Sequence, residues 1–84
     1  MGDEDAAANR PPNCRLFLGN LASEKTSRAE LMEIFGKYGN IIEEIIMRRS
    51  FGFIQYDSPE AALAALQHEQ GRSIGGLRVG IHIR

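Results

Sequence analysis

The stretch Arg49-Ser-Phe-Gly-Phe-Ile-Gln-Tyr56 decides the fold, because its short apolar pattern is that of a β-strand. Successive side chains of a strand point to opposite faces of a sheet. One face of this strand therefore carries Phe51 and Phe53, and the other carries Ile54 and Tyr56. The fold depends on which of these two faces packs into the core.

The strands expected at residues 15–20 and 77–84 indicate which face is buried, because both separate aliphatic from aromatic or basic side chains. One arrangement satisfies all three strands, with the aliphatic side chains beneath the helices. The buried set is then Leu16, Leu18, Ile54, Tyr56, Leu77, Val79, Ile81 and Ile83. The open face then carries Phe17, Phe51 and Phe53 among Arg15, Arg49, Gln55, Arg78 and His82. The alternative, a core filled by the phenylalanines, would bury arginines and expel the aliphatic residues.

Two helices are expected between the strands. Ser27-Arg-Ala-Glu30 has the pattern of a capping box and begins a helix that ends near Gly36 and Gly39. Ser58-Pro59 places an N-cap residue before a proline at the first helical position, and this second helix ends at Gly71. Both helices follow strands, so each connects two strands of one sheet.

The segment 41–47 is rich in β-branched residues and strand-like, with a bulge expected at Glu43-Glu44. The predicted order is β-α-β-β-α-β, an α+β ferredoxin-like sandwich. Its four-stranded antiparallel sheet carries both helices on one face, and the other face stays bare. We expect residues 14–84 to form this domain, after a flexible, acidic and proline-containing leader at residues 1–13.

Composition excludes several classes of protein. The 84 residues, 43% hydrophobic and 25% charged, suit one small globular domain. No run of about 18 apolar residues is present, so we expect no membrane span. Cys14 is the only cysteine, which is typical of an intracellular compartment. The adjacent carboxylates of Glu43 and Glu44 lack an apparent third ligand for a metal ion. We therefore expect neither a metal nor a cofactor.

The charge distribution is weakly compatible with nucleic-acid binding. The net charge is −1, and it becomes +2 without the acidic residues Asp3, Glu4 and Asp5. Eight of the ten basic residues are arginine, which is suited to phosphate contacts and base stacking. Charge alone does not decide between nucleic acid and other partners.

Phenylalanines flanked by arginines on an open sheet predict a surface for unstacked nucleobases. An aromatic ring provides a stacking plane worth roughly 1–3 kcal/mol per base. A duplex hides its bases, so a single strand fits better. The predicted binding residues are Phe17, Phe51, Phe53, Arg49, Arg15, Gln55, Arg78, His82 and Arg84. For Gln55, His82, Arg78 and Arg84, an ordinary solvated surface position remains the alternative.

Two motifs carry a family resemblance. Leu16-Phe-Leu-Gly-Asn-Leu21 resembles the RNP2 hexamer of the RNA recognition motif family. Residues 49–56 resemble its RNP1 octamer, with Ser50 where glycine is usual. The resemblance extends over about residues 14–84, and the two motifs occur in the expected order on the first and third strands.

By position, the resemblance implies distinct roles at a dinucleotide of single-stranded RNA. Phe17 would stack under the 5′ base and Phe53 under the next base. Phe51 would lie between the two riboses, and Arg49 would pair with the phosphate between them. Main-chain groups of residues 82–84 would contact base edges.

The short link Arg48–Ser50 makes the chain most similar to two subgroups of the family. These are the heterogeneous nuclear ribonucleoprotein C group and yeast nuclear RNA-binding proteins of transcription termination. The resemblance implies a nuclear location, RNA processing or termination, and a preference for U-rich or pyrimidine single strands. It also implies a monomeric domain, with other RNA-processing proteins as further partners.

Two other functions occur on this topology, acyl-phosphate hydrolysis and peptide binding. Acylphosphatase shares the topology but needs an arginine-bearing phosphate loop after the first strand, and residues 21–26 hold no arginine. We therefore expect no enzyme. Some family members bind a peptide on the helical side, where Ala61 and Ala64 are expected to face outward. Such members usually have degraded aromatic motifs, whereas the three phenylalanines here are intact.

Overall fold

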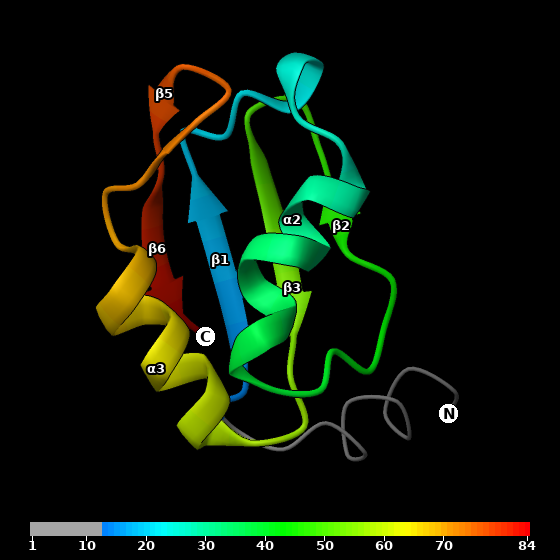
Figure 1. Ribbon diagram of the computed structural model, residues 1–84, viewed down its shortest axis with the longest axis vertical. Helices are drawn as coiled ribbons and strands as arrows, with labels where there is room; N and C mark the ends of the chain where they lie inside the picture. Colours follow the sequence, from blue (N-terminus) through cyan, green and yellow to red (C-terminus); the bar gives the residue numbers. More distant parts are fainter. Residues whose placement is uncertain (1–12) are drawn as a thin grey trace.

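Four strands form one antiparallel sheet in the order β2-β3-β1-β6, and two helices cover one of its faces (Figure 1). The computed structural model describes residues 13–84, so the predicted leader at residues 1–13 lies outside the described residues apart from Asn13. The sheet and its helices are β1 (Arg15–Gly19), α2 (Arg28–Phe35), β2 (Ile46–Met47), β3 (Phe51–Gln55), α3 (Pro59–Glu69) and β6 (Gly80–Ile83). The minor elements are η1 (Ser23–Lys25), η2 (Gly36–Tyr38), β4 (Ser73–Ile74) and β5 (Leu77–Arg78). The predicted ferredoxin-like α+β fold is confirmed.

The core lies between the sheet and the helices. Register places Leu16 opposite Ile54 on one side and Ile83 on the other. The buried cluster is Leu16, Leu18, Leu21, Leu31, Phe35, Ile45, Ile54, Tyr56, Ala61, Ala62, Ala65, Ile74, Val79 and Ile81. The hydroxyl of Tyr56 donates to the carbonyl of Phe35 at 2.6 Å, which satisfies its polar atom in the core. The aliphatic face predicted for the central strands is therefore the buried one.

Both helices begin at the predicted serines. The Ser27 hydroxyl accepts from the amide of Glu30 at 3.1 Å, and the Ser58 hydroxyl accepts from the amide of Ala61 at 3.3 Å. The outward orientation expected for Ala61 is wrong, because its side chain is only 4% exposed. A Cβ on Gly39 would stand 2.4 Å from the Cβ of Ala61, so the segment after η2 packs directly on α3 at this point.

The second strand is shorter than the predicted segment 41–47. Only Ile46–Met47 pairs continuously with β3, and Ile41 forms an isolated bridge with Tyr56. The paired positions Ile41 and Ile46 are five residues apart in the sequence, whereas their partners on the other strand, Tyr56 and Phe53, are three residues apart. The two extra residues interrupt the ladder, as a bulge at Glu43-Glu44 would.

The predicted last strand at residues 77–84 is broken in two. Gly80–Ile83 pairs with β1, whereas Leu77–Arg78 turns back to pair with β4. Gly75 and Gly76, with φ of 62° and 91°, make the tight turn of this hairpin. The prediction that Leu77 lies in the core is wrong, because the hairpin leaves it 45% exposed. Ile83 is partly buried and packs against the core.

The described part of the chain, residues 13–84, holds no helix that is long and apolar enough to cross a membrane.

Candidate nucleic-acid interface

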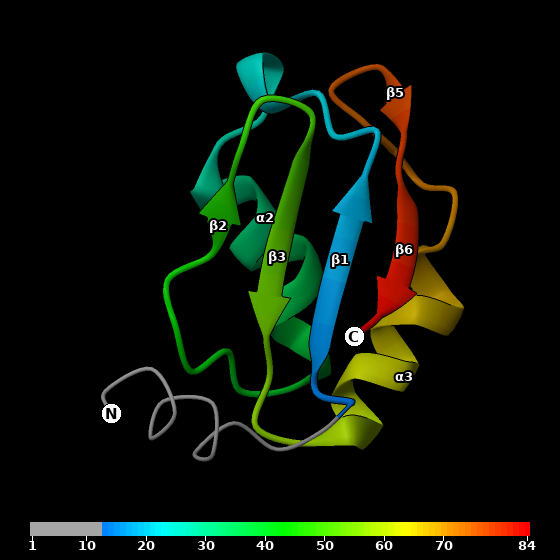
Figure 2. The ribbon, with the colours of Figure 1, turned by 180° about the vertical axis from the view of Figure 1, so that it is seen from behind.

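Figure 2 shows the face of the sheet that the helices leave bare. Three phenylalanine rings of β1 and β3 meet on this face. Phe17 lies opposite Phe53 in the β1–β3 ladder, and their ring centroids are 5.4 Å apart. Phe51 is 5.8 Å from each of the other two rings, stacked on Phe17 and edge-on to Phe53. All three side chains are half-buried. These separations are those of favourable aromatic pairs, so the rings form one cluster.

Gly19 makes room for this cluster. It lies opposite Phe51 at the end of the ladder. A Cβ on Gly19 would stand 3.1 Å from the ring of Phe17, which is tighter than ordinary contact. Gly19, the last residue of β1, therefore lets the Phe17 ring lie along the strand toward Phe51.

Two arginines lie over the rings. The guanidinium carbon of Arg15 is 4.3 Å from the centroid of Phe53, and that of Arg84 is 4.6 Å from the centroid of Phe17. His82, across the β1–β6 ladder, has its ring 6.1 Å from Phe17. These contacts are cation–π and ring contacts at the surface. The face thus offers flat rings together with positively charged guanidinium groups, a combination that suits a base and its phosphate.

Two predicted arginines lie outside the ring cluster. Arg49 is exposed in the β2–β3 turn, which the amide of Arg48 closes by donating to Phe51 at 2.8 Å. Arg78 is exposed in the β4–β5 hairpin, and its carbonyl accepts from the side chain of Asn20 at 2.9 Å. Both remain available to phosphates beyond the rings.

Gln55 differs from its prediction. Parity places it on the same side of β3 as Phe53, but it is only 5% exposed. Its amide nitrogen donates to the carbonyl of Tyr56 at 3.1 Å, so the side chain folds back on the backbone at the strand end. The prediction that Gln55 presents a base-reading amide on the open face is therefore wrong.

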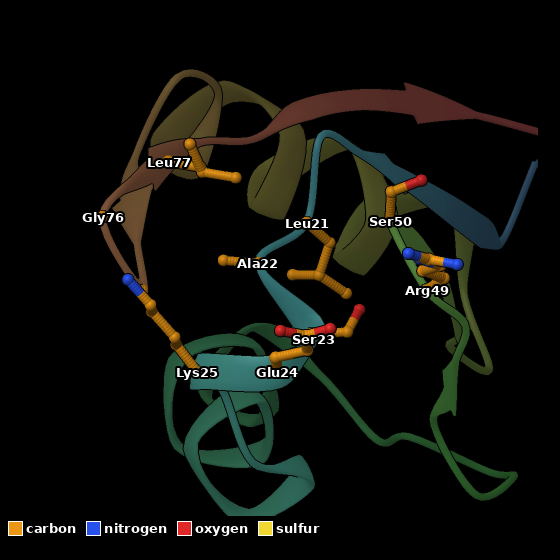
Figure 3. A pocket seen from close by; sticks show the side chains of 10 residues that line it. Leu21, Ala22, Ser23, Glu24, Lys25, Arg49, Ser50, Gly76 and Leu77 are labelled. Atoms are coloured by element: carbon orange, nitrogen blue, oxygen red, sulfur yellow. The ribbon is translucent and has the colours of Figure 1, made fainter.

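A cavity of about 350 Å³ lies between the segment after β1, the turn that precedes β3 and the β4–β5 hairpin (Figure 3). Three segments line it, residues 21–25, which include η1, residues 49–50, and residues 75–77, which end in β5. Sequence reasoning missed this site because the alternation of Leu77 with Val79 hides the hairpin. The Gly75-Gly76 pair was the available signal, since consecutive glycines are typical of a two-residue hairpin turn.

A polar cluster joins η2 to the end of α3. The Tyr38 hydroxyl donates to Glu69, whose carboxylate also accepts from Arg72 at 2.8 Å and lies 3.7 Å from Lys37. The His68 ring stacks on Tyr38 at 5.7 Å. Burial raises the pKa of Tyr38 to about 12, and the bond to Glu69 adds to this. Burial alone would raise the pKa of Glu69, but Tyr38, Arg72 and Lys37 outweigh it and lower that pKa.

The polar cluster joins helical elements and lies off the open face. Within residues 13–84, no three His, Cys, Asp or Glu side chains gather so that they could hold a metal ion.

Comparison with known proteins identifies the family. Residues 16–80 match the family model described as RNA recognition motif. Nuclear polyadenylated RNA-binding protein 3 of Saccharomyces cerevisiae is 43% identical over 61 residues, covering 73% of this chain and 8% of that protein. Polyadenylate-binding protein 5 of Arabidopsis thaliana is 39% identical over 71 residues, covering 77% of this chain and 10% of that protein. The chain thus spans about a tenth of the length of these relatives.

A solved structure agrees with the sequence matches. It comes from work on cis element recognition of non-polyadenylated RNAs by the Nab3-RRM, and it superposes with a TM-score of 0.78 at 33% identity. The match covers 86% of this chain and 95% of that one. The expected likeness to a yeast nuclear RNA-binding domain is confirmed. Because the family model spans most of the chain, with its two motifs on β1 and β3, the chain belongs to the RNA recognition motif family of RNA-binding modules, which are not enzymes.

Proposed function

We propose that residues 14–84 bind single-stranded RNA on the open face of the sheet. The observation that carries this proposal is the cluster of three half-buried phenylalanine rings, each within 5.8 Å of the others, with a guanidinium over two of them. An apolar patch on an exposed face usually marks a binding site. The residues assigned to the interface are Phe17, Phe51, Phe53, Arg15, Arg84, His82, Arg49 and Arg78.

Base stacking would replace the arginines that lie over Phe17 and Phe53. A surface cation–π contact stabilises by about 0.5–1 kcal/mol. A stacked base contributes roughly 1–3 kcal/mol. The exchange therefore favours the base, and each displaced guanidinium becomes free to contact a phosphate. The 5.4 Å between the two ring centroids suits two consecutive bases on adjacent strands of the sheet.

We also propose a role in nuclear RNA processing or transcription termination, with a preference for U-rich or pyrimidine RNA. The support is the likeness to a yeast protein whose name describes it as nuclear and RNA-binding. The domain would act as a monomer, and other RNA-processing proteins would be further partners of the whole protein.

The test is an NMR titration of the domain with short single-stranded oligonucleotides of U, C, A and G. Shifts should fall on residues 15–19, 49–53 and 78–84. Phe53→Ala should weaken binding by about 5- to 150-fold, the range that corresponds to one stacked base. Leu63→Ala is the matched control, because Leu63 is 47% exposed on α3.

Other outcomes would contradict parts of this proposal. Shifts confined to α2 and α3 would reject the open face and favour the alternative, a peptide bound on the helical side. Equal binding of U, C, A and G would reject the pyrimidine preference alone. An equal loss of RNA affinity in Leu63→Ala would show that the effect of Phe53→Ala is not specific to the Phe53 ring.

A further inference from the structure

We propose that the cavity at the loop end of the sheet holds one further base of the bound strand, next to the bases stacked on the rings. This inference rests on the proposed binding of RNA by the open face. It assigns a second contact region to residues 21–25, 49–50 and 75–77, none of which belongs to the ring cluster.

The size and lining of the cavity suit a single base. Its volume of about 350 Å³ is at the lower end of the range of about 300–1,000 Å³ that is typical of small-ligand sites. One side of the cavity is formed by Gly76 and Leu77, and the other by Arg49 and Ser50 (Figure 3). Leu21 and Ala22 lie between these two sides. Leu77 is 45% exposed, so an apolar surface is available for the flat face of a base.

An unsatisfied hydroxyl lies beside the cavity. Thr26 is 8% exposed, and its Oγ1 is the one buried side-chain polar atom without a hydrogen-bond partner within residues 13–84. A Cβ added to Gly75 would stand only 2.8 Å from this oxygen. Because residue 75 is a glycine, no side chain lies against the hydroxyl on that side. A buried polar group without a partner is costly. Thr26 does not itself line the cavity, whereas Gly75 does, so a base bound against Gly75 would lie near this hydroxyl with no side chain of residue 75 between them.

Charges on the two sides match a nucleotide better than an apolar ligand. Lys25 lies on the side of Gly76, and Arg49 lies on the opposite side with Ser50 (Figure 3). Both cations are exposed and can meet the phosphates on either side of a base. The carboxylate of Glu24, also at the cavity, would repel phosphate but can accept from a base amino group.

The cavity also continues the proposed RNA path. Arg49 and Ser50 immediately precede Phe51, whose ring belongs to the cluster. The amide of Leu21 donates to the carbonyl of Ser50 at 2.9 Å, which joins the loop after β1 to the turn before β3. A strand that crosses the rings therefore reaches the cavity without leaving the protein surface.

The experiment compares a uridine dinucleotide with trinucleotides extended at the 5′ or the 3′ end. Each extension is either an abasic nucleotide or one of the four ordinary nucleotides, so that the added phosphate is the same. At one end, an extension with a base should bind at least about fivefold more tightly than the abasic one, in line with the lower limit for base stacking. This advantage should disappear in Leu77→Ala and in Ala22→Leu, which narrows the cavity, and persist in the control Leu63→Ala.

The outcomes separate this inference from the proposed function. If no oligonucleotide binds the wild-type domain, or if Phe53→Ala has no effect, the binding of RNA by the open face is itself rejected, and the cavity inference falls with it. If the wild type binds and Phe53→Ala weakens binding, but base and abasic extensions are equal at both ends, only the cavity inference is overturned. An advantage that survives in both Leu77→Ala and Ala22→Leu also overturns it.

Discussion

Replacing Phe17 separates the role of its ring in RNA binding from its role in stability. The ring contacts Phe51, Phe53 and the guanidinium of Arg84. Phe17→Leu keeps an apolar side chain but removes the stacking plane, so RNA affinity should fall by about 5- to 150-fold, the equivalent of 1–3 kcal/mol. Two ring–ring contacts worth about 0.5–1.5 kcal/mol each are also lost, so the free energy of unfolding should fall by about 1–3 kcal/mol.

The assay combines calorimetric RNA titration with urea unfolding of the same samples. Phe17→Tyr is the matched control, because it keeps the ring, and it should bind RNA nearly as tightly as the wild type. Removing a core phenylalanine side chain typically costs about 3–5 kcal/mol. That range applies to replacement by alanine, so a loss of stability of this size in Phe17→Ala, with RNA affinity unchanged in the folded fraction, would refute the placement of Phe17 on a binding face.

Three further predictions concern charge, pH and close packing. The wild type should show a log–log salt slope of roughly −1.5 to −2, and Arg49→Ala should flatten it by about 0.7, measured by titrations in increasing KCl; an unchanged slope would exclude a phosphate contact. Because its partners lower the folded-state pKa of Glu69, its stabilising effect is present above the ordinary value of 4.5 and is lost as the pH falls through the folded-state value. Thermal unfolding should therefore show a wild-type advantage over Glu69→Gln at pH 7 that shrinks below pH 4.5; a difference constant with pH would contradict the shift. A Cβ on Gly52 would stand 2.6 Å from the carbonyl oxygen of Ile46, so Gly52→Ala should disrupt the β2–β3 pairing and lower the melting temperature.

The fold and the ring cluster could be predicted because several strands imposed the same constraint. Leu16 and Phe17 had to face opposite ways, and so did Phe53 and Ile54, so only one orientation of both strands buried the aliphatic residues. The caps at Ser27 and Ser58 act over three residues and are therefore visible in the sequence.

The remaining errors have physical causes that a strand pattern does not contain. The alternation of Leu77 and Val79 with other residues fits a strand of the main sheet and a strand of a separate hairpin equally well, because side chains alternate with a period of two in both. Gln55 has the parity of the open face, but at a strand end its amide reaches the adjacent carbonyl instead of solvent. The cavity depends on three segments that meet only in the folded chain, so no local segment encodes it.

The interruption of β2 has a consequence for recognition through backbone hydrogen bonds. β2 is an outer strand of the sheet, and only Ile46–Met47 presents a regular ladder there. The exposed Glu44 lies in the irregular stretch just before it. Short, irregular and charged edges resist the addition of a strand from another molecule. This edge is therefore a poor template for an extended peptide or for a second sheet.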